Sequence, residues 1–179
     1  GKRAEEFIDY MPIVREYLKQ AAIITNSTCA LVQHIDDEWI YIEKEEPLIP
    51  FRVTINIGQR FKINSGATGK LFVAYMDYTM QQKIIEELGL KALTNKTITE
   101  KMEFEKELQK IRNQGYSISF EEHYEGIDGI AVPIFDRNGQ VQMAITSILV
   151  HKSNAQEEYK DKAEKLKELA RELSEKIFI

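Results

Sequence analysis

The residues with the most chemical potential in this sequence are three histidines, one of which stands beside two carboxylates. His34 and His151 are isolated, whereas His123 follows Glu121 and Glu122. None of them has the H-x-x-x-H or H-E-x-x-H spacing of a zinc site. On a strand, Glu121 and His123 would point to one face and could share a ligand, while Glu122 could not. A metal would need further ligands that we cannot assign, so we expect a hydrogen-bonded acidic segment and no metal site.

Nucleophilic catalysis has no support in the sequence. There is no G-x-S-x-G motif, and Cys29 lies inside an apolar run, where a buried and inert thiol is the default. Because Cys29 is the single cysteine, an internal disulfide is excluded, which fits a reducing cytoplasm. We therefore expect no catalytic residues, no cofactor and no enzyme activity.

Residues 65–70, Ser-Gly-Ala-Thr-Gly-Lys, resemble a phosphate-binding loop in part. The motif G-x-x-x-x-G-K-[ST] requires Gly at position 64 and Ser or Thr at position 71, where this chain has Asn64 and Leu71, so nucleotide hydrolysis is not expected. Small residues that open a helix still leave free N–H groups and the positive end of the helix dipole. They favour a bound small carboxylate; the alternative is that they only let the helix pack closely on a sheet.

The composition sets limits on the elements that must position these residues. The chain has 179 residues, 43% of them hydrophobic and 30% charged, which excludes disorder and predicts one domain with a real core. No apolar run is long enough for a membrane helix. The net charge of −5 argues against a nucleic-acid binder acting alone.

An amphipathic helix is predicted over residues 4–24. One apolar stripe includes Met11 and Val14, and a second includes Tyr10 and Ile13. The two stripes indicate either that this helix contacts more than its own domain or that it has a single wide core face.

The rest of the chain alternates between strands and helices. Apolar runs bounded by turn residues predict six strands, over residues 28–35, 38–43, 51–57, 116–120, 129–135 and 141–150. Helical spacing and capping signals predict helices over residues 66–76, 79–89, 97–113 and 155–177. Thr79 and Thr97 open the capping signals of two of these helices. Hairpin turns between consecutive strands imply an antiparallel sheet, and therefore an α+β fold with helices on one or both faces.

Several short blocks, taken in order, resemble one protein family. Residues 58–60 (Gly-Gln-Arg) and 66–74 (Gly-Ala-Thr-Gly-Lys-Leu-Phe-Val-Ala) are similar to the G-x-R and A-x-G-K-A-x-x-A segments of IclR-type transcriptional regulators. The pattern continues through the blocks at residues 97–99, 107–116, 121–122, 126–127, 130–136, 139 and 144–145. The resemblance spans about residues 8–177.

The resemblance implies a GAF-like effector-binding domain with a sheet of about five to six strands and long N- and C-terminal helices. We assign residues 1–24 to a linker or N-terminal helix and residues 25–179 to this domain. A DNA-binding winged helix-turn-helix domain is expected upstream and is absent from this chain. The implied partners are a small-molecule metabolite (an organic acid or an aromatic compound), further copies in a homodimer or tetramer, and operator DNA only through the missing domain; no membrane partner is implied.

By the same resemblance, an effector pocket lies between the sheet and the helix that starts near Gly66. Asn64 stands where a His is common, Ser119 where some members have Asp, and Gly129 where many have Cys, while Ile148 replaces a frequent small polar residue. These changes make one end of the pocket less polar. The implied wall consists of Phe61, Ala67, Thr68, Ser119, Ile127, Gly129, Thr146 and Ile148.

The sequence thus predicts a non-enzymatic, ligand-sensing domain of an IclR-like regulator, in which a metabolite shifts the arrangement of an oligomer. Two alternatives stay open. One is a GAF-type sensor of another signalling protein, such as a kinase or cyclase. The other is an enzyme that acts on a small organic acid, although no acid–base pair with a nucleophile can be assembled.

Overall fold

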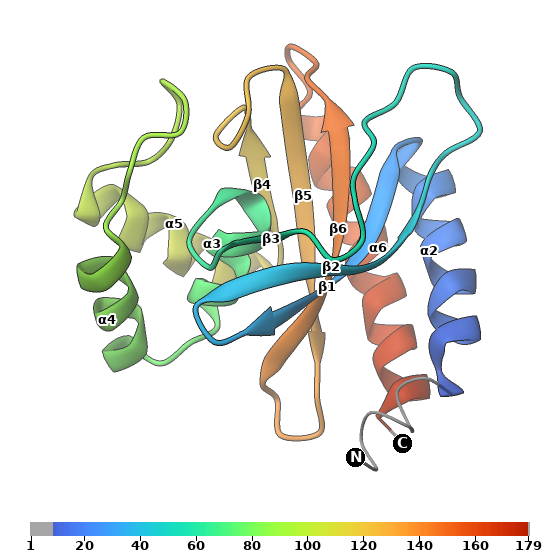
Figure 1. Cartoon of the computed structure of the whole chain (residues 1–179), viewed down its shortest axis with the longest axis horizontal. Coiled ribbons are helices and arrows are strands. Elements are labelled where there is room, and N and C mark those ends of the chain that lie inside the picture. The colour runs from blue at the N-terminus through green and yellow to red at the C-terminus, as the bar shows by residue number, and fades with distance from the viewer. Residues whose placement is uncertain (1–8, 179) are drawn as a thin grey trace.

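A computed structural model describes residues 9–178 as three layers, with a central antiparallel sheet between two groups of helices (Figure 1). The α+β fold predicted from the sequence is confirmed. The described elements are α2 (Met11–Thr25), β1 (Thr28–Ile35), β2 (Glu38–Glu45), β3 (Arg60–Lys62), α3 (Gly66–Ala74), α4 (Tyr78–Leu88), α5 (Lys101–Gln114), β4 (Ser117–Phe120), β5 (Ile127–Phe135), β6 (Val141–Val150) and α6 (Gln156–Ile177).

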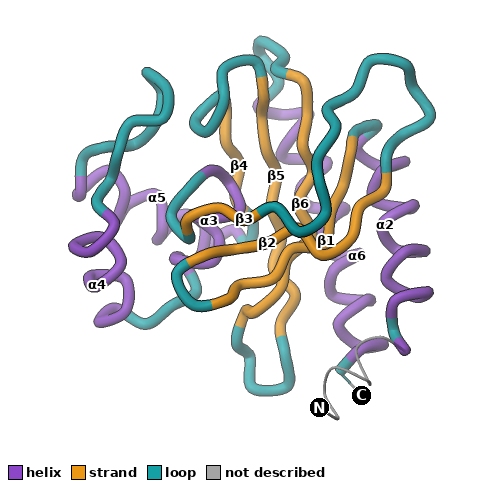
Figure 2. The backbone as a smooth tube through the Cα atoms, in the orientation of Figure 1, coloured by secondary structure: helices purple, strands orange, loops and turns teal. Residues whose placement is uncertain are grey.

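The sheet has six strands in the order β3-β2-β1-β6-β5-β4, and every neighbouring pair is antiparallel. The first strand therefore lies in the middle, beside β6 from the other end of the chain (Figure 2). Side chains alternate between two cores, because successive residues of a strand point to opposite faces. On β5, Ile130 and Val132 face α2 and α6, whereas Ala131 faces α3 and α5.

Helix α2 confirms the predicted helix over residues 11–24, and Tyr10 before it is a turn residue. Residues 4–8 of the predicted helix lie outside the described residues. Val14 is completely buried, and Tyr10 and Ile13 pack, half-buried, against the same core. The two apolar stripes therefore form one wide core face. The exposed apolar residue of this helix is Ile23, at 80%.

The strand predicted over residues 51–57 is wrong. These residues belong to a long loop between β2 and β3, drawn in teal at the upper right of Figure 2. Of the predicted buried face, Ile55 is buried, but Phe51 is 78% exposed and Ile57 is 52% exposed. Pro50 precedes this run and lacks the N–H that a ladder needs. The strand that completes this side of the sheet is the three-residue β3.

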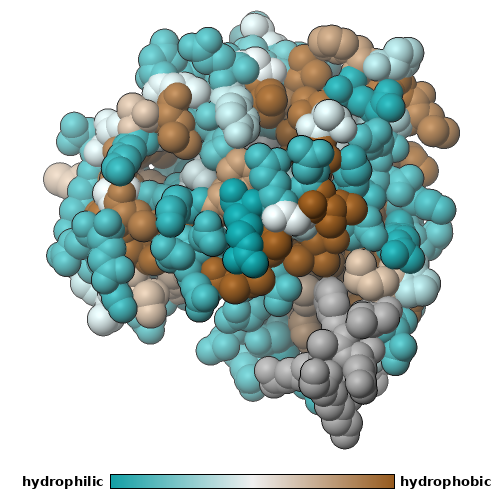
Figure 3. All heavy atoms as spheres, in the orientation of Figure 1, coloured by the Kyte–Doolittle hydropathy of each residue, from teal (hydrophilic) through white to brown (hydrophobic). Residues whose placement is uncertain are grey.

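The loop also shapes the surface. Leu48, Phe51 and Ile57 are exposed on it. In the space-filling view, hydrophobic side chains gather near the centre of the face, around β2 and β3, and are bordered by hydrophilic ones (Figure 3). Among the described residues, no helix combines the length and apolar character needed to cross a membrane.

Both predicted threonine caps are corrected by the structure. Helix α4 starts after Asp77, whose carboxylate accepts a hydrogen bond of 2.8 Å from the N–H of Met80, so Thr79 is inside the helix. Helix α5 starts at Lys101 without a side-chain cap. The Thr97 hydroxyl instead donates to the carbonyl of Glu122 at 2.7 Å. The remaining strand ends lie within two residues of their predicted positions.

Candidate functional site

The eight residues of the predicted pocket wall all line one cavity, which has a volume of about 300 Å³. The cavity lies on the α3 side of the sheet, between the first turn of α3, the strands β4, β5 and β6, and the segment 121–127. The structure thus brings together Phe61 of β3, Ala67 and Thr68 of α3, Ser119 of β4, Ile127 and Gly129 of β5, and Thr146 and Ile148 of β6. Their role in effector binding is a separate matter and stays a prediction.

Sheet register explains why these residues meet. Gly129 stands opposite both Ser119 and Ile148 across its two neighbouring strands. Because Gly129 has no side chain, α3 approaches closely: a Cβ added there would lie 3.2 Å from the Cβ of Ala67. Gly69 likewise lets the chain before α3 approach the helix closely, because a Cβ added at Gly69 would lie 2.5 Å from the carbonyl oxygen of Ile63. Part of the small-residue pattern therefore serves packing.

The polar part of the cavity wall consists of two threonines and the start of α3. The hydroxyl oxygens of Thr68 and Thr146 are 2.8 Å apart, and both residues are buried. The N-cap residue Ser65 gives no side-chain cap, because its hydroxyl donates to the carbonyl of Lys62 at 2.8 Å. Within the described residues, the N–H groups of Gly66, Ala67 and Thr68 have no hydrogen-bond acceptor. They are available to an oxygen atom in the cavity.

An aromatic wall faces this polar part, and sequence reasoning missed most of it. Trp39 stacks on Phe61 with ring centroids 4.5 Å apart, and Tyr41 lies edge-on to Phe61 at 5.6 Å. His123 lies edge-on to Phe61 at 5.2 Å and to Tyr124 at 4.4 Å. All five residues line the cavity. The period of two in residues 38–43 places Trp39 and Tyr41 on one face, but it does not say that α3 covers that face.

Two buried nitrogen atoms of this wall have no hydrogen-bond partner. They are Nε1 of Trp39 and Nδ1 of His123, two of the four such side-chain atoms among the described residues. Burial lowers the pKa of His123, so its ring is neutral at neutral pH. Among residues 9–178, no lysine or arginine lines the cavity. A negatively charged ligand would therefore depend on the amides of α3.

The strand geometry that would let Glu121 and His123 share a ligand is not found in the structure. Residues 121–126 form a loop rather than a strand, and Glu121 has a left-handed backbone with φ of 58°. Its carboxylate turns to Lys96 and His151, away from the aromatic wall that holds His123. Within residues 9–178 no group of three or more histidine, cysteine, aspartate or glutamate side chains is arranged so that it could hold a metal ion. Burial raises the pKa of Cys29 to about 11, which keeps its thiol protonated and unreactive.

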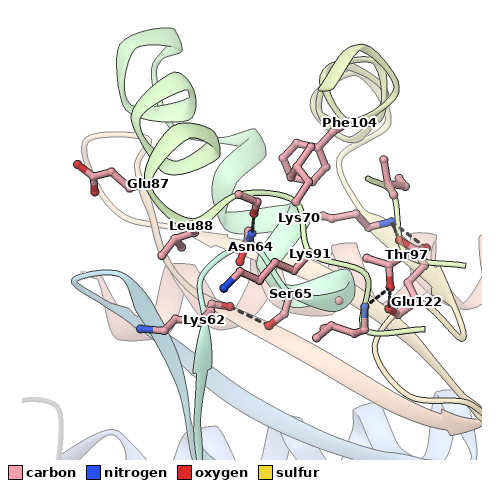
Figure 4. Close-up of a pocket in the computed structure, with 15 residues that line it drawn as sticks. Lys62, Asn64, Ser65, Lys70, Glu87, Leu88, Lys91, Thr97, Phe104 and Glu122 are labelled. Carbon is pink, nitrogen blue, oxygen red and sulfur yellow. Dashed lines mark hydrogen bonds and ion pairs between the residues drawn. The ribbon is translucent and has the colours of Figure 1, made fainter. Parts of the chain in front are cut away.

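A second cavity, of about 210 Å³, lies on the other side of the start of α3, and Gly66 borders both. Figure 4 shows it between the loop before α3, the loop after α4, and Phe104 of α5. The Asn64 side chain donates to the carbonyl of Gly89 at 2.6 Å, which ties two of these segments together. Lys70 is almost completely buried and is turned toward Glu122.

The comparisons with known proteins agree with this geometry. The crystal structure of IclR from Thermotoga maritima has a TM-score of 0.86 and 29% identity, covering 94% of this chain and 68% of that one. The C-terminal domain of KdgR from Escherichia coli has a TM-score of 0.77 and 28% identity, covering 96% of this chain and 99% of that domain. The fold is therefore that of the C-terminal domains of transcriptional regulators.

Sequence similarity specifies the family. The family model described as bacterial transcriptional regulator IclR C-terminal matches residues 6–175. This chain belongs to the IclR family. It is 33% identical to the HTH-type transcriptional regulator KdgR of Escherichia coli over 141 residues, which is 79% of this chain and 54% of that protein. It is 30% identical to the transcriptional repressor YiaJ of the same organism over 180 residues, 99% of this chain and 64% of that protein. The chain thus spans about half to two thirds of these relatives.

Proposed function

We propose that this domain senses a small-molecule metabolite, which binds in the cavity lined by Ala67, Thr68 and Thr146. The observation that carries the proposal is that eight residues taken from a family resemblance line a single cavity of about 300 Å³. An apolar cavity of ~150 Å³ accommodates benzene. A compound with a ring-sized body and a few polar substituents therefore fits this space.

The lining indicates how such a ligand would be oriented. A carboxylate or carbonyl oxygen would accept hydrogen bonds from the first N–H groups of α3, where the helix dipole favours negative charge. The hydroxyls of Thr68 and Thr146 would bind the same end. The apolar body would lie against Phe61, Ile127 and Ile148.

The protein that contains this domain would act as a ligand-dependent regulator without enzyme activity. Its DNA contacts would come from a separate domain, and ligand binding would shift the equilibrium between arrangements of a dimer or tetramer. The names of the relatives support regulation of transcription. The assignment of residues 1–24 to a linker helix and of residues 25–179 to the sensing domain is part of this proposal.

A thermal-shift screen with organic acids and aromatic acids tests the function. A ligand at 100 times its dissociation constant stabilises a protein by about 2.7 kcal/mol. In a chain of this size, the melting temperature then rises by roughly 5–10 °C. If no acid of either class, added in large excess to the folded protein, raises the melting temperature, the proposal is contradicted.

Two substitutions test whether the ligand binds in this cavity or elsewhere. We expect Ala67→Trp to fill the space and abolish the shift, while the exposed substitution Ala92→Trp keeps it. Thr146→Val retains the shape and removes one hydrogen bond, so affinity falls by about 0.5–1.5 kcal/mol, and more for a charged ligand. Binding that is unaffected by both Ala67→Trp and Thr146→Val would mean that the ligand binds at another site.

A further inference from the structure

His151 lies between two carboxylates at the edge of the cavity wall. Its Nδ1 is 2.9 Å and 3.1 Å from the two carboxylate oxygens of Asp128, whose side chain is completely buried. Its Nε2 is 3.0 Å from Oε1 of Glu121. Asp128 belongs to β5, His151 follows the end of β6, and Glu121 follows β4, so the imidazole joins three segments.

The geometry suits only the charged form of the imidazole. A neutral imidazole has one N–H and one bare nitrogen, whereas ionised carboxylates only accept hydrogen bonds. The imidazolium donates to both carboxylates, and such charge-assisted bonds are about twice as strong as neutral ones. After loss of the proton, one ring nitrogen must face a carboxylate without a hydrogen between them.

The other groups around His151 decide which contact is lost. Asp128 also accepts from the hydroxyl of Tyr159 at 2.6 Å and from the N–H of Lys152 at 3.2 Å. Burial and the bond to Asp128 raise the pKa of Tyr159, so its hydroxyl stays a donor. Glu121 is paired with Lys96 at 3.1 Å and lies nearer to solvent. An unpaired buried carboxylate costs more than an exposed one, so the remaining N–H stays with Asp128.

Glu121 in turn holds the segment that carries part of the cavity wall. Its second carboxylate oxygen accepts from the N–H of Gly126 at 3.0 Å, and its own N–H donates to the carbonyl of Ile127 at 3.1 Å. These bonds close residues 121–127 into a compact turn. His123, Tyr124 and Ile127, which line the cavity, all belong to it.

We propose that His151 is a positioning residue of the cavity: while protonated it holds segment 121–127 in the cavity wall, and loss of its proton releases Glu121 and loosens that segment. We call the contact between protonated His151 and Glu121 the latch. The consequence for a ligand rests on the proposed function of the cavity, whereas the latch itself is a property of the chain. Histidine is the side chain that can change its charge near physiological pH. The wall is then better ordered, and a ligand is bound more tightly, while the imidazole keeps its proton.

Amide hydrogen exchange of the 179-residue chain tests the latch without a ligand. Protection factors, which correct for the intrinsic pH dependence of exchange, are compared for the N–H groups of Glu121 and Gly126 at pH 5.5 and pH 8. We expect protection to fall about tenfold at the higher pH, as for one lost charge-assisted hydrogen bond. Fluorescence of Trp39, the single tryptophan, gives a second readout from the same wall.

Variants separate this role from a merely structural one. His151→Gln carries no positive charge at either pH, so protection stays low at both pH values. Glu121→Gln reverses the pH step, which is the fall in protection between pH 5.5 and pH 8. The carbonyl of the new side chain can keep the Gly126 bond. Its amide donates to the neutral imidazole and clashes with the charged one. His34→Gln, whose imidazole bonds to the carbonyl of Asp36, is the matched control and keeps the wild-type step.

The outcomes separate the latch from the proposed function. A pH step that persists in His151→Gln overturns the latch and would assign the step to another group, such as His123. If the wild-type chain shows no pH step in protection and binds a ligand equally at pH 5.5 and pH 8, the latch is overturned and the proposed function stands. A step with the predicted response in both variants supports the latch even if no acid in the screen binds.

Discussion

Lys70 lies on α3 and lines the smaller, second cavity, not the 300 Å³ cavity of the proposed ligand. Its Nζ contacts Glu107 at 2.8 Å, Glu122 at 3.0 Å and the carbonyl of Ile118 at 2.9 Å. These three acceptors satisfy all three ammonium protons. The lysine that resembles a phosphate-binding residue in the sequence therefore joins α3, α5 and the start of segment 121–127.

Replacing Lys70 by methionine leaves two carboxylates without their cation. Because both keep some contact with solvent, we expect Lys70→Met to lower the free energy of unfolding by about 2–4 kcal/mol at pH 7, somewhat less than for a fully buried pair. Burial already raises the pKa of Glu122, and this effect is larger than the opposing effect of Lys70. A raised folded-state pKa gives stability that is present in acid and lost as the pH rises. The deficit of Lys70→Met should therefore shrink between pH 7 and pH 4.5.

Denaturant unfolding at the two pH values measures this deficit. Lys101→Met is a suitable control, because Lys101 is exposed and lies 3.9 Å from Glu105. Its effect should stay within about 0.5 kcal/mol. An equal deficit for Lys70→Met at both pH values would show that lost packing, and not the carboxylates, causes the destabilisation.

Residue-level prediction from the sequence found fewer than half of the residues that line the cavity and missed the rest. Ala67 and Thr68 were found because they belong to a short block that resembles a known family, and Gly129 and Thr146 because they adjoin such blocks. Trp39 and His123 were missed because their position depends on which sheet face α3 covers and on how the 121–127 turn closes. Both are long-range properties that no local pattern records.

Elements were predictable from the sequence where local and long-range forces agree. Strands β1 and β6 have dense apolar runs and occupy the centre of the sheet, where each has a strand on both sides. Residues 51–57 have an alternating pattern as well, but they do not pair with any strand of the sheet. The pattern of Thr97 was misleading for another reason: its hydroxyl bonds to Glu122, 25 residues away in the sequence.

The start of α4 offers a sharp test of a corrected element. Removing the cap in Asp77→Ala should cost about 1 kcal/mol, because the N–H of Met80 loses its acceptor. Thr79→Ala, two residues later on the exposed face, should change stability by less than about 0.5 kcal/mol. Both values come from denaturant unfolding. A larger loss for Thr79→Ala than for Asp77→Ala would restore threonine as the cap.

At the scale of the whole molecule, charge limits what this chain can do by itself. The net charge is −5, and most basic residues of α6 are paired with acidic neighbours, as in Lys162 with Glu158 and Arg171 with Glu168. Binding to duplex DNA depends on basic side chains that neutralise phosphates. We therefore expect no binding of labelled duplex DNA in fluorescence anisotropy at physiological salt. Tight and sequence-specific binding by these 179 residues would contradict this.

The position of β1 has a consequence for synthesis on the ribosome. This strand is made early, but its second neighbour, β6, ends at Val150. Until then, β1 and β2 form a hairpin with one open edge and two apolar faces, a state prone to association. We expect chains truncated before residue 150 to aggregate rather than fold. The domain should therefore be completed in one late step, when its last strand emerges and closes the sheet.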